Sequence, residues 1–257
     1  MRRRLFLALI PLVLLATSSA FAAEKRTLRV AAAANLKDAA DAIALAFQGE
    51  HADVEVKVTI GASGNFFAQI QNGAPFDLFL SADTEYPDKI VAAGLARAED
   101  ERVYAFGKLI AWLPPGSTID LEKTGLDALG DRSVKHIAIA NPAVAPFGRA
   151  TEQAFKAAGI YDAVKDKLVL GTSVAQTSQF ATTGAADVAF LPYSLTFSKE
   201  LSGGKVFFVP EKLYARIEQS GVVLASSKEA DRARNLLAFI TGERGRAILT
   251  RFGYGLP

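Results

Sequence analysis

Residues 28–47 read LRVAAAANLKDAADAIALAF, and this stretch sets the pattern on which the rest of the chain is built. Its opening, residues 28–33, is an apolar run of the length of a buried strand. The apolar residues that follow recur at the spacing of one helix face, at Leu36, Ala39, Ala40, Ile43 and Phe47. The stretch therefore predicts a strand that passes into a helix through small residues and one amide, Asn35.

The same alternation continues outward along the chain. We expect further strands at residues 54–60, 76–80, 109–113, 136–140, 168–170, 188–191 and 221–225. Helical spacing is found between them, at residues 66–70, 86–93, 148–158 and 174–183, and two more helices close the chain. Strands that alternate with helices of this length are typical of βα units. The sequence therefore predicts the α/β class, with mostly parallel sheets flanked by helices.

The middle of the chain shows a transition in the pattern. The turn-rich loop Leu113-Pro-Pro-Gly-Ser-Thr118 follows an apolar strand, and a further strand returns near the end, at residues 221–225. A chain of 257 residues can form two lobes of about 100 residues each. We predict lobe I from residues 23–107 and 216–257, lobe II from residues 108–215, and two segments that cross between them.

The first residues have the pattern of an export signal. Three arginines at positions 2–4 precede an apolar run over residues 5–15, and small residues then lead to an Ala-x-Ala site that ends at Ala22. The run is shorter than the roughly 20 residues of a membrane span. We predict a signal peptide over residues 1–22, with cleavage after Ala22 or Ala23, and a periplasmic mature protein. Cleavage of the signal peptide removes three arginines, so the formal net charge of +2 becomes about −1 in the mature protein.

The composition excludes several classes of function. The chain has no cysteine, which excludes disulfides, thiolate metal sites, cysteine nucleophiles and a cysteine-linked lipid anchor. His51 and His136 are too few for a histidine-rich metal centre, and the near-neutral charge indicates no nucleic-acid partner. The sequence contains no G-x-S-x-G elbow, and capping explains Asp83 and Glu85 at a helix start. A periplasmic hydrolase is therefore a distant alternative.

A recurring junction stands out instead. After several of the apolar strands, small, hydroxyl or amide residues open a helix, as in Ala33-Ala-Asn-Leu36, Gly61-Ala-Ser-Gly-Asn65, Ser81-Ala-Asp83 and Gly171-Thr-Ser-Val174. Helix N-termini expose backbone N–H groups that suit an anion, and ligands of open α/β sheets bind at the carboxyl ends of the strands. Ordinary N-capping is the alternative explanation of any single junction. The repetition in both halves of the chain favours a bound anion.

These junctions resemble motifs of the periplasmic molybdate-binding proteins. The resemblance lies in Leu28-Arg-Val-Ala-Ala-Ala-Ala-Asn-Leu36, Gly61-Ala-Ser-Gly64, Ala74-Pro-Phe-Asp-Leu-Phe-Leu-Ser-Ala-Asp83, Ala140-Asn-Pro142, Ala145-Pro-Phe-Gly148 and Arg251-Phe-Gly-Tyr254, in order over the mature chain. It implies the type II solute-binding fold, in which two α/β lobes close on a tetrahedral oxyanion. It also implies a monomer without cofactor or enzymatic activity, which delivers molybdate, and often tungstate, to an ABC permease in the inner membrane.

The resemblance assigns the ligand contacts residue by residue. The first-loop contact falls on Asn35, whose amide can donate in place of the serine of many members, and the second-loop contact falls on Ser63. Phe147 and Val174 match positions at which only the backbone N–H contacts the ligand. Tyr193 matches a tyrosine hydroxyl that some members add, and it is a weaker match because a proline separates it from the preceding strand.

The residues leave the identity of the oxyanion open. No Arg or Lys occurs in the loop cores 31–36, 61–65 and 171–174, so the predicted donors are neutral. A phosphate site commonly includes an acceptor for the proton that phosphate carries near neutral pH, and the four best-matched positions supply none. Sulfate differs from molybdate mainly in size, which a sequence does not measure. A receptor for sulfate or another tetrahedral oxyanion is therefore the main alternative.

Overall fold

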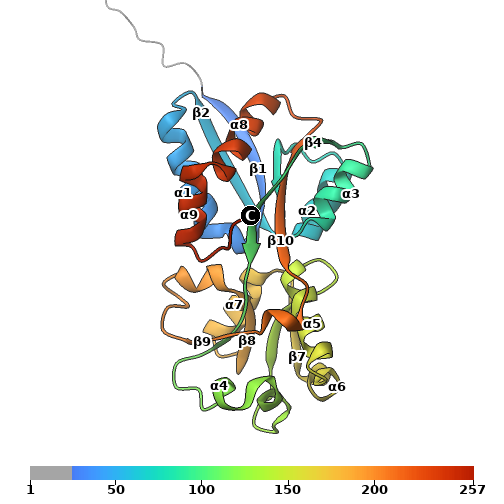
Figure 1. Ribbon diagram of the computed structural model, residues 1–257, viewed down its shortest axis with the longest axis vertical. Helices are drawn as coiled ribbons and strands as arrows, with labels where there is room; N and C mark the ends of the chain where they lie inside the picture. The colour runs from blue at the N-terminus through green and yellow to red at the C-terminus, as the bar shows by residue number, and fades with distance from the viewer. Residues whose placement is uncertain (1–24) are drawn as a thin grey trace, which may run out of the picture.

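The computed structural model describes residues 25–257, which form two α/β lobes, each built around one five-stranded sheet (Figure 1). The predicted signal peptide, residues 1–22, lies outside the described residues, as do both predicted cleavage points. Within the described part of the chain, no helix is both long and apolar enough to cross a membrane.

The first sheet consists, in spatial order, of β2 (Val54–Gly61), β1 (Arg26–Ala33), β3 (Leu78–Leu80), β10 (Ile217–Leu224) and β4 (Ala96–Gly107). β1 pairs in parallel with β2 and β3, whereas β10 pairs antiparallel with β3 and β4. Alternate residues of β1 enter different hydrophobic clusters, with Val30 in one and Ala31 in the other. Both faces of this sheet are therefore covered, which explains why its central strands read as continuous apolar runs.

The second sheet consists, in spatial order, of β7 (Leu168–Gly171), β6 (Ile137–Ala140), β8 (Val188–Pro192), β5 (Leu109–Leu113) and β9 (Lys205–Phe208). β6 pairs in parallel with β7 and β8, and β5 pairs antiparallel with β8 and β9. The predicted α/β class is confirmed, and the parallel arrangement holds for the three-stranded core of each sheet. Antiparallel strands extend both cores.

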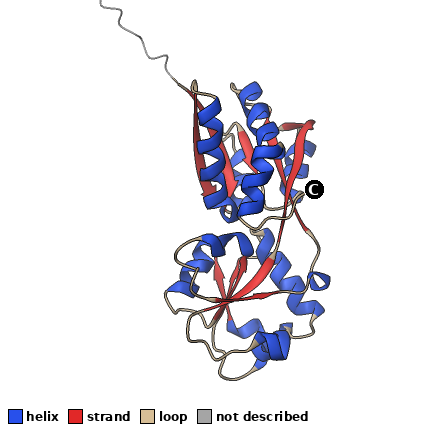
Figure 2. Ribbon diagram, turned by 60° about the vertical axis from the view of Figure 1, so that its left-hand side comes forward, coloured by secondary structure: helices blue, strands red, loops and turns tan. Residues whose placement is uncertain are grey.

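Helices flank both sheets (Figure 2). In the first lobe, α1 (Lys37–Glu50), α8 (Ala230–Thr241) and α9 (Glu243–Arg251) cover one face, and α2 (Ser63–Gln71) and α3 (Glu85–Ala92) cover the other. The second lobe contains α4 (Leu121–Thr124), α5 (Pro146–Ala157), α6 (Tyr161–Val164) and α7 (Val174–Thr182). On α5, the buried residues include Ala150, Ala154 and Phe155, which lie on one side of the helix at the expected spacing.

The chain crosses between the lobes twice, from β4 to β5 and from β9 to β10 (Figure 1). The strands of each sheet fall within one predicted lobe, and the boundaries after residues 107 and 215 remain a prediction. The sequence pattern did not indicate β4, because its residues 97–102 are mostly charged and the strand lies at the edge of its sheet. Apart from Ala96, its buried apolar residues, Tyr104 and Ala105, come only near the crossing point.

Candidate functional site

A small cavity lies where the two lobes meet. The first lobe lines it with residues at the carboxyl ends of β1 and β2 and just after β3, and the second lobe lines it with the starts of α5 and α7. Its volume is about 10 Å³, near the minimum for one buried water, so a sugar, an amino acid or a peptide does not fit while the lobes are in contact. None of its lining residues carries a charged side chain.

Three helices begin at this cavity, one from the first lobe and two from the second. α2 begins with Ser63, Phe147 is the second residue of α5, and α7 begins with Val174. The first N–H groups of a helix have no intrahelical acceptor and carry partial positive charge. Each helix has nine or more residues, long enough for a developed dipole. The cavity is therefore supplied with neutral donors from both lobes.

The lobes are in close contact beside the cavity, and Gly64 permits this contact. Its N–H donates to the carbonyl of Val144 in the second lobe at 2.9 Å. A Cβ atom at Gly64 would lie 2.9 Å from Val144 Cα and 2.5 Å from Tyr86 Oη, closer than real Cβ contacts. Small residues of the first lobe also pack into the core of the second, at Ala33, Ala34 and Ala82.

Asn35 is held at the cavity wall by a buried polar network. It lies in the 3-10 turn Ala34–Leu36 and is 2% exposed. Its Nδ2 donates to Gln219 Oε1 at 2.8 Å and to Tyr254 Oη at 3.0 Å. Its backbone carbonyl accepts from Tyr254 Oη at 2.7 Å and from Ser194 Oγ of the second lobe at 2.9 Å. Within the described chain, Asn35 Oδ1 and Gln219 Nε2 are buried without a hydrogen-bond partner.

Ser63 lies on the same wall and is 1% exposed. Its Oγ accepts the N–H of Ala82 at 3.0 Å, which ties the start of α2 to the segment after β3. Because the oxygen acts as acceptor in this bond, the hydroxyl hydrogen is free to donate. Ser63 can therefore offer both its hydroxyl and its backbone N–H to an anion in the cavity.

The structure brings four of the five residues predicted from the sequence to this cavity, and leaves Tyr193 outside. Phe147 and Val174 line it, with side chains that belong to the core of the second lobe. Tyr193 is not among the lining residues, because its ring packs on Phe197 and Phe208 with ring centroids 5.3 and 4.8 Å apart. The structure therefore does not place Tyr193 at this cavity, and a contact of its hydroxyl with the ligand stays a prediction.

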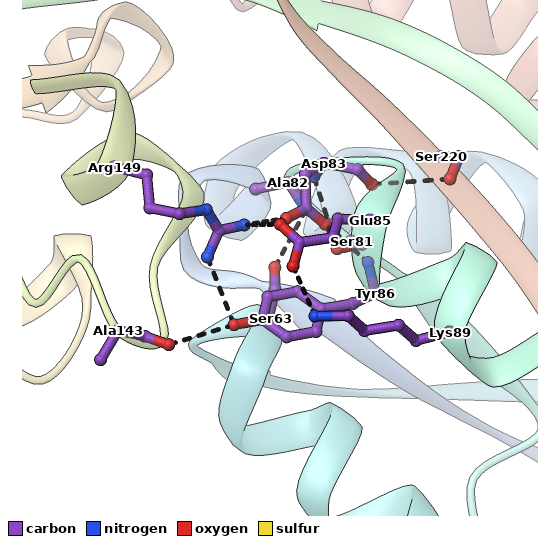
Figure 3. A network of polar contacts seen from close by, with 10 residues as sticks. All are labelled: Ser63, Ser81, Ala82, Asp83, Glu85, Tyr86, Lys89, Ala143, Arg149 and Ser220. Atoms are coloured by element: carbon purple, nitrogen blue, oxygen red, sulfur yellow. Dashed lines mark hydrogen bonds and ion pairs between the residues drawn. The ribbon is translucent and has the colours of Figure 1, made fainter. Parts of the chain in front are cut away.

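A charged network, which we call the rim network, joins the lobes beside the cavity (Figure 3). It consists of Asp83, Glu85 and Tyr86 from the first lobe and Arg149 from α5. Arg149 pairs with the carboxylate of Asp83 and, at 3.2 Å, with that of Glu85, and it donates to Tyr86 Oη at 3.3 Å. Tyr86 donates in turn to the carbonyl of Ala143 at 3.3 Å. Capping alone does not explain these carboxylates, because they also fasten the lobes together.

Burial and hydrogen bonds shift the pKa of several groups around the site. It raises the pKa of the Asp83 carboxyl, against the opposing effects of the Ser81 hydroxyl and the Arg149 charge. The pKa of Glu85 is lowered, chiefly by its hydrogen bond from Lys89. Burial also raises the pKa of the Tyr104 and Tyr254 hydroxyls above the ordinary value, so both remain protonated donors near neutral pH.

Sequence reasoning missed the residues that support Asn35. Gln219, Tyr254 and Ser194 lie 184, 219 and 159 positions from Asn35 in the chain. A local pattern does not pair residues at such separations. Tyr254 alone carried a signal, because it ends the motif Arg251-Phe-Gly-Tyr254.

Known proteins share both this sequence and this fold. The bacterial extracellular solute-binding protein family matches residues 28–255. The molybdate-binding protein ModA of Azotobacter vinelandii is 36% identical over 238 residues, which cover 92% of this chain and 93% of the relative. ModA of Rhodobacter capsulatus is 37% identical over 224 residues, which cover 87% of this chain and 86% of the relative. The solved structure of the Azotobacter vinelandii periplasmic molybdate-binding protein aligns with a TM-score of 0.83 at 32% identity, covering 90% of this chain and 99% of that one. The chain therefore belongs to the bacterial extracellular solute-binding protein family.

Proposed function

We propose that this protein captures molybdate in the periplasm by closing its two lobes over the cavity, and delivers it to an ABC importer in the inner membrane. The observation that carries the proposal is a small cavity between the lobes, lined from both of them, without a charged side chain. The helix starts that meet at it from both lobes suit an anion. The close relatives named as molybdate-binding proteins support molybdate as that anion.

The roles of the residues follow from their positions. The Ser63 hydroxyl and backbone N–H donate from the first lobe, and the backbone N–H groups of Phe147 and Val174 donate from the second. Asn35 completes the set through its side-chain amide. Hydrogen bonds to a charged group each contribute about 1.5–3 kcal/mol, so a few such donors suffice for tight binding.

Neutral donors also suit release to a transporter. An ion held by a buried counter-charge leaves that charge unpaired when it departs, which is strongly unfavourable. Here the donors on the two lobes separate when the lobes open, and no buried side-chain charge is exposed. The function is one of binding and delivery, without chemistry on the ligand, and tungstate is expected to bind as an ion of the same charge and shape.

Sulfate is the alternative ligand, because it has the same charge and shape. The two ions differ in size, and donors set for the larger ion would not all reach the oxygens of the smaller one. Each donor left unreached in a closed cavity costs about 1–3 kcal/mol. We therefore expect selection against sulfate.

A thermal-shift series over molybdate, tungstate, sulfate and phosphate tests the proposal. A ligand at a hundredfold excess over its Kd stabilises the native state by about 2.7 kcal/mol. For a chain of this size, molybdate should then raise the Tm by roughly 5–11 °C, with little shift from equal sulfate. Equal shifts from molybdate and sulfate would leave only an unselective oxyanion receptor, and a shift from sulfate alone would contradict the proposed ligand.

A further inference from the structure

Two buried amides beside the cavity, those of Asn35 and Gln219, each have one atom without a hydrogen-bond partner. Asn35 Nδ2 donates to Gln219 Oε1 and Tyr254 Oη, at 2.8 and 3.0 Å. Within the described residues, the atoms left over are Asn35 Oδ1 and Gln219 Nε2. Asn35 is one of the residues that line the cavity, and the one side-chain polar atom that it has without a partner is an acceptor.

This orientation of the two amides does not suit an oxyanion. The oxygens of the ion are acceptors, and a carbonyl oxygen facing them in a dry cavity adds repulsion rather than a hydrogen bond. The orientation also buries the N–H₂ group of Gln219 without an acceptor, and a buried N–H without a partner is rarer than a buried carbonyl without one.

The Tyr104 hydroxyl next to the amides has fewer hydrogens than its neighbouring acceptors require. Tyr104 has one hydroxyl hydrogen, which it donates to the carbonyl of Ser81 at 2.6 Å, yet Gln219 Oε1 also lies 3.2 Å from this hydroxyl. Tyr254 and Ser194 both donate to the Asn35 carbonyl, at 2.7 and 2.9 Å, so Tyr254 can direct its hydrogen elsewhere without leaving that carbonyl without a donor. A donor in place of Gln219 Oε1 would relieve the shortage.

We propose that with an oxyanion in the cavity both amides are turned over, so that Gln219 positions Asn35 with its N–H₂ group toward the ligand. The two ends of an amide have the same shape, so the packing does not change. Gln219 Nε2 then donates one hydrogen to Asn35 Oδ1 and the other to Tyr104 Oη. Tyr254 also donates to Asn35 Oδ1, while Ser194 keeps the Asn35 carbonyl. Both hydrogens of Asn35 Nδ2 face the ion, and the only amide atom left without a partner is an acceptor, Gln219 Oε1.

Gln219 thereby acts as a positioning residue that also sets specificity. It lies on β10 and its partner Tyr104 lies on β4, so the strands next to both lobe crossings fix which end of the Asn35 amide faces the cavity. An N–H₂ group there favours a fully deprotonated oxyanion, whereas a carbonyl would favour an ion that still carries a proton. The inference rests on the proposed function, because it is the bound oxyanion that selects this orientation.

Nuclear magnetic resonance of the wild-type protein saturated with molybdate tests the orientation directly, once the side-chain amide signals are assigned. The amide hydrogens of Gln219 should show a nuclear Overhauser contact to the ring protons of Tyr104. Amide hydrogens of Asn35 in contact with the ring of Tyr254 would overturn the inference, because they belong to the opposite orientation. If Gln219 had a purely structural role, the contact between its amide hydrogens and the ring of Tyr104 would not replace the contact between the Asn35 amide hydrogens and the ring of Tyr254.

Substitutions of Gln219 give a second test by calorimetry. In Gln219→Glu a carboxylate that only accepts holds Asn35 Nδ2 on itself, so molybdate affinity should fall about 10- to 150-fold. In Gln219→Met the donor is lost without added charge, and affinity should fall roughly 2- to 12-fold. The matched control is Gln153→Glu, an exposed glutamine on α5 whose Oε1 accepts from the N–H of Ala215 at 3.2 Å. It should bind within about twofold of wild type.

Failure of the inference can be told from failure of the proposed function. If wild-type protein gives no heat with molybdate, the proposed ligand is wrong and the question of orientation does not arise. If wild type binds molybdate and Gln219→Glu binds within about twofold of it, the positioning role of Gln219 is overturned while the proposed function stands. The Tm of each variant without ligand checks that it folds.

Discussion

The cavity and the rim network are neighbours with opposite chemistry. Ala82 lines the cavity and Asp83, the next residue, belongs to the rim. The cavity offers neutral donors such as Ser63, whereas the rim joins the lobes through the charges of Asp83 and Arg149. Part-exposed ion pairs contribute on the order of 1 kcal/mol, but unpaired charges or donors in a desolvated cavity cost more. The difference indicates that the cavity determines affinity and the rim adjusts closure.

The largest expected effect is that of a charge placed inside the neutral cavity. Asn35→Asp keeps the shape of the side chain and sets a carboxylate against a dianion in a desolvated site. We expect molybdate affinity to fall by at least about 150-fold near neutral pH, as measured by calorimetry. Asn65→Asp on α2 is the control, because its side chain is exposed. Normal binding by Asn35→Asp would show that Asn35 does not face the ion.

Loss of one neutral donor should have the next largest effect. Ser63→Ala removes a hydroxyl from the cavity and leaves the N–H of Ala82 without its acceptor. Molybdate affinity should fall about 10- to 150-fold, and the protein should lose roughly 1 kcal/mol of stability without ligand. Titration and thermal unfolding measure the two effects, with the exposed Ser202→Ala as control. An unchanged Kd would remove Ser63 from the site.

A change in the rim should matter less than either change in the cavity. Arg149→Met breaks the ion pairs with Asp83 and Glu85, and affinity for molybdate should fall by up to about fivefold at low salt. The effect should shrink at high salt mainly through the pair with Glu85, because that carboxylate is half exposed whereas Asp83 is mostly buried. Lys156→Met on the same helix breaks a pair with Glu152 within one lobe and should leave affinity unchanged. A loss as large as that of Ser63→Ala would erase the distinction between cavity and rim.

An ion pair far from both regions should affect stability alone. A hydrogen bond from Arg234, helped by Arg97, holds the pKa of Asp100 at about 2, below its ordinary value of 3.8. Because the folded pKa is the lower one, the pair stabilises the protein above about pH 4, and this contribution is lost as the pH falls toward 2. Asp100→Asn should cost about 1–2 kcal/mol at pH 7 and little near pH 2, seen by thermal unfolding. A changed Kd for molybdate in Asp100→Asn would contradict the expectation that this ion pair acts on stability alone.

The sequence predicted the fold where local pattern and burial agree. The apolar run at residues 28–33 and the helix face from Leu36 to Phe47 became β1 and α1, because both elements bury a regular set of residues. β4 was missed because Arg97, Glu99 and Arg102 face solvent from an edge strand and give no apolar alternation.

The site was predicted only as far as its loops are local. Asn35 and Ser63 stand in strand-to-helix junctions that the sequence shows directly. The support of Asn35 by Gln219 and the pairing of Asp83 with Arg149 depend on the closure of the chain on itself, over 184 and 66 positions. Tyr193 lies outside the cavity because the 3-10 turn that follows Pro192, the last residue of β8, directs its ring to an aromatic cluster.

The central claim is that neutral donors in the cavity, rather than ion pairs, hold the oxyanion. Calorimetric titration of wild-type protein with molybdate at about 20 mM and about 500 mM NaCl tests it most directly, because added salt screens exposed charges far more than buried hydrogen bonds. The account predicts tight binding of one ion per chain, with a Kd that changes by less than about threefold between the two salt concentrations. Absence of heat at low salt, or a loss of affinity greater than about tenfold at high salt, would contradict it.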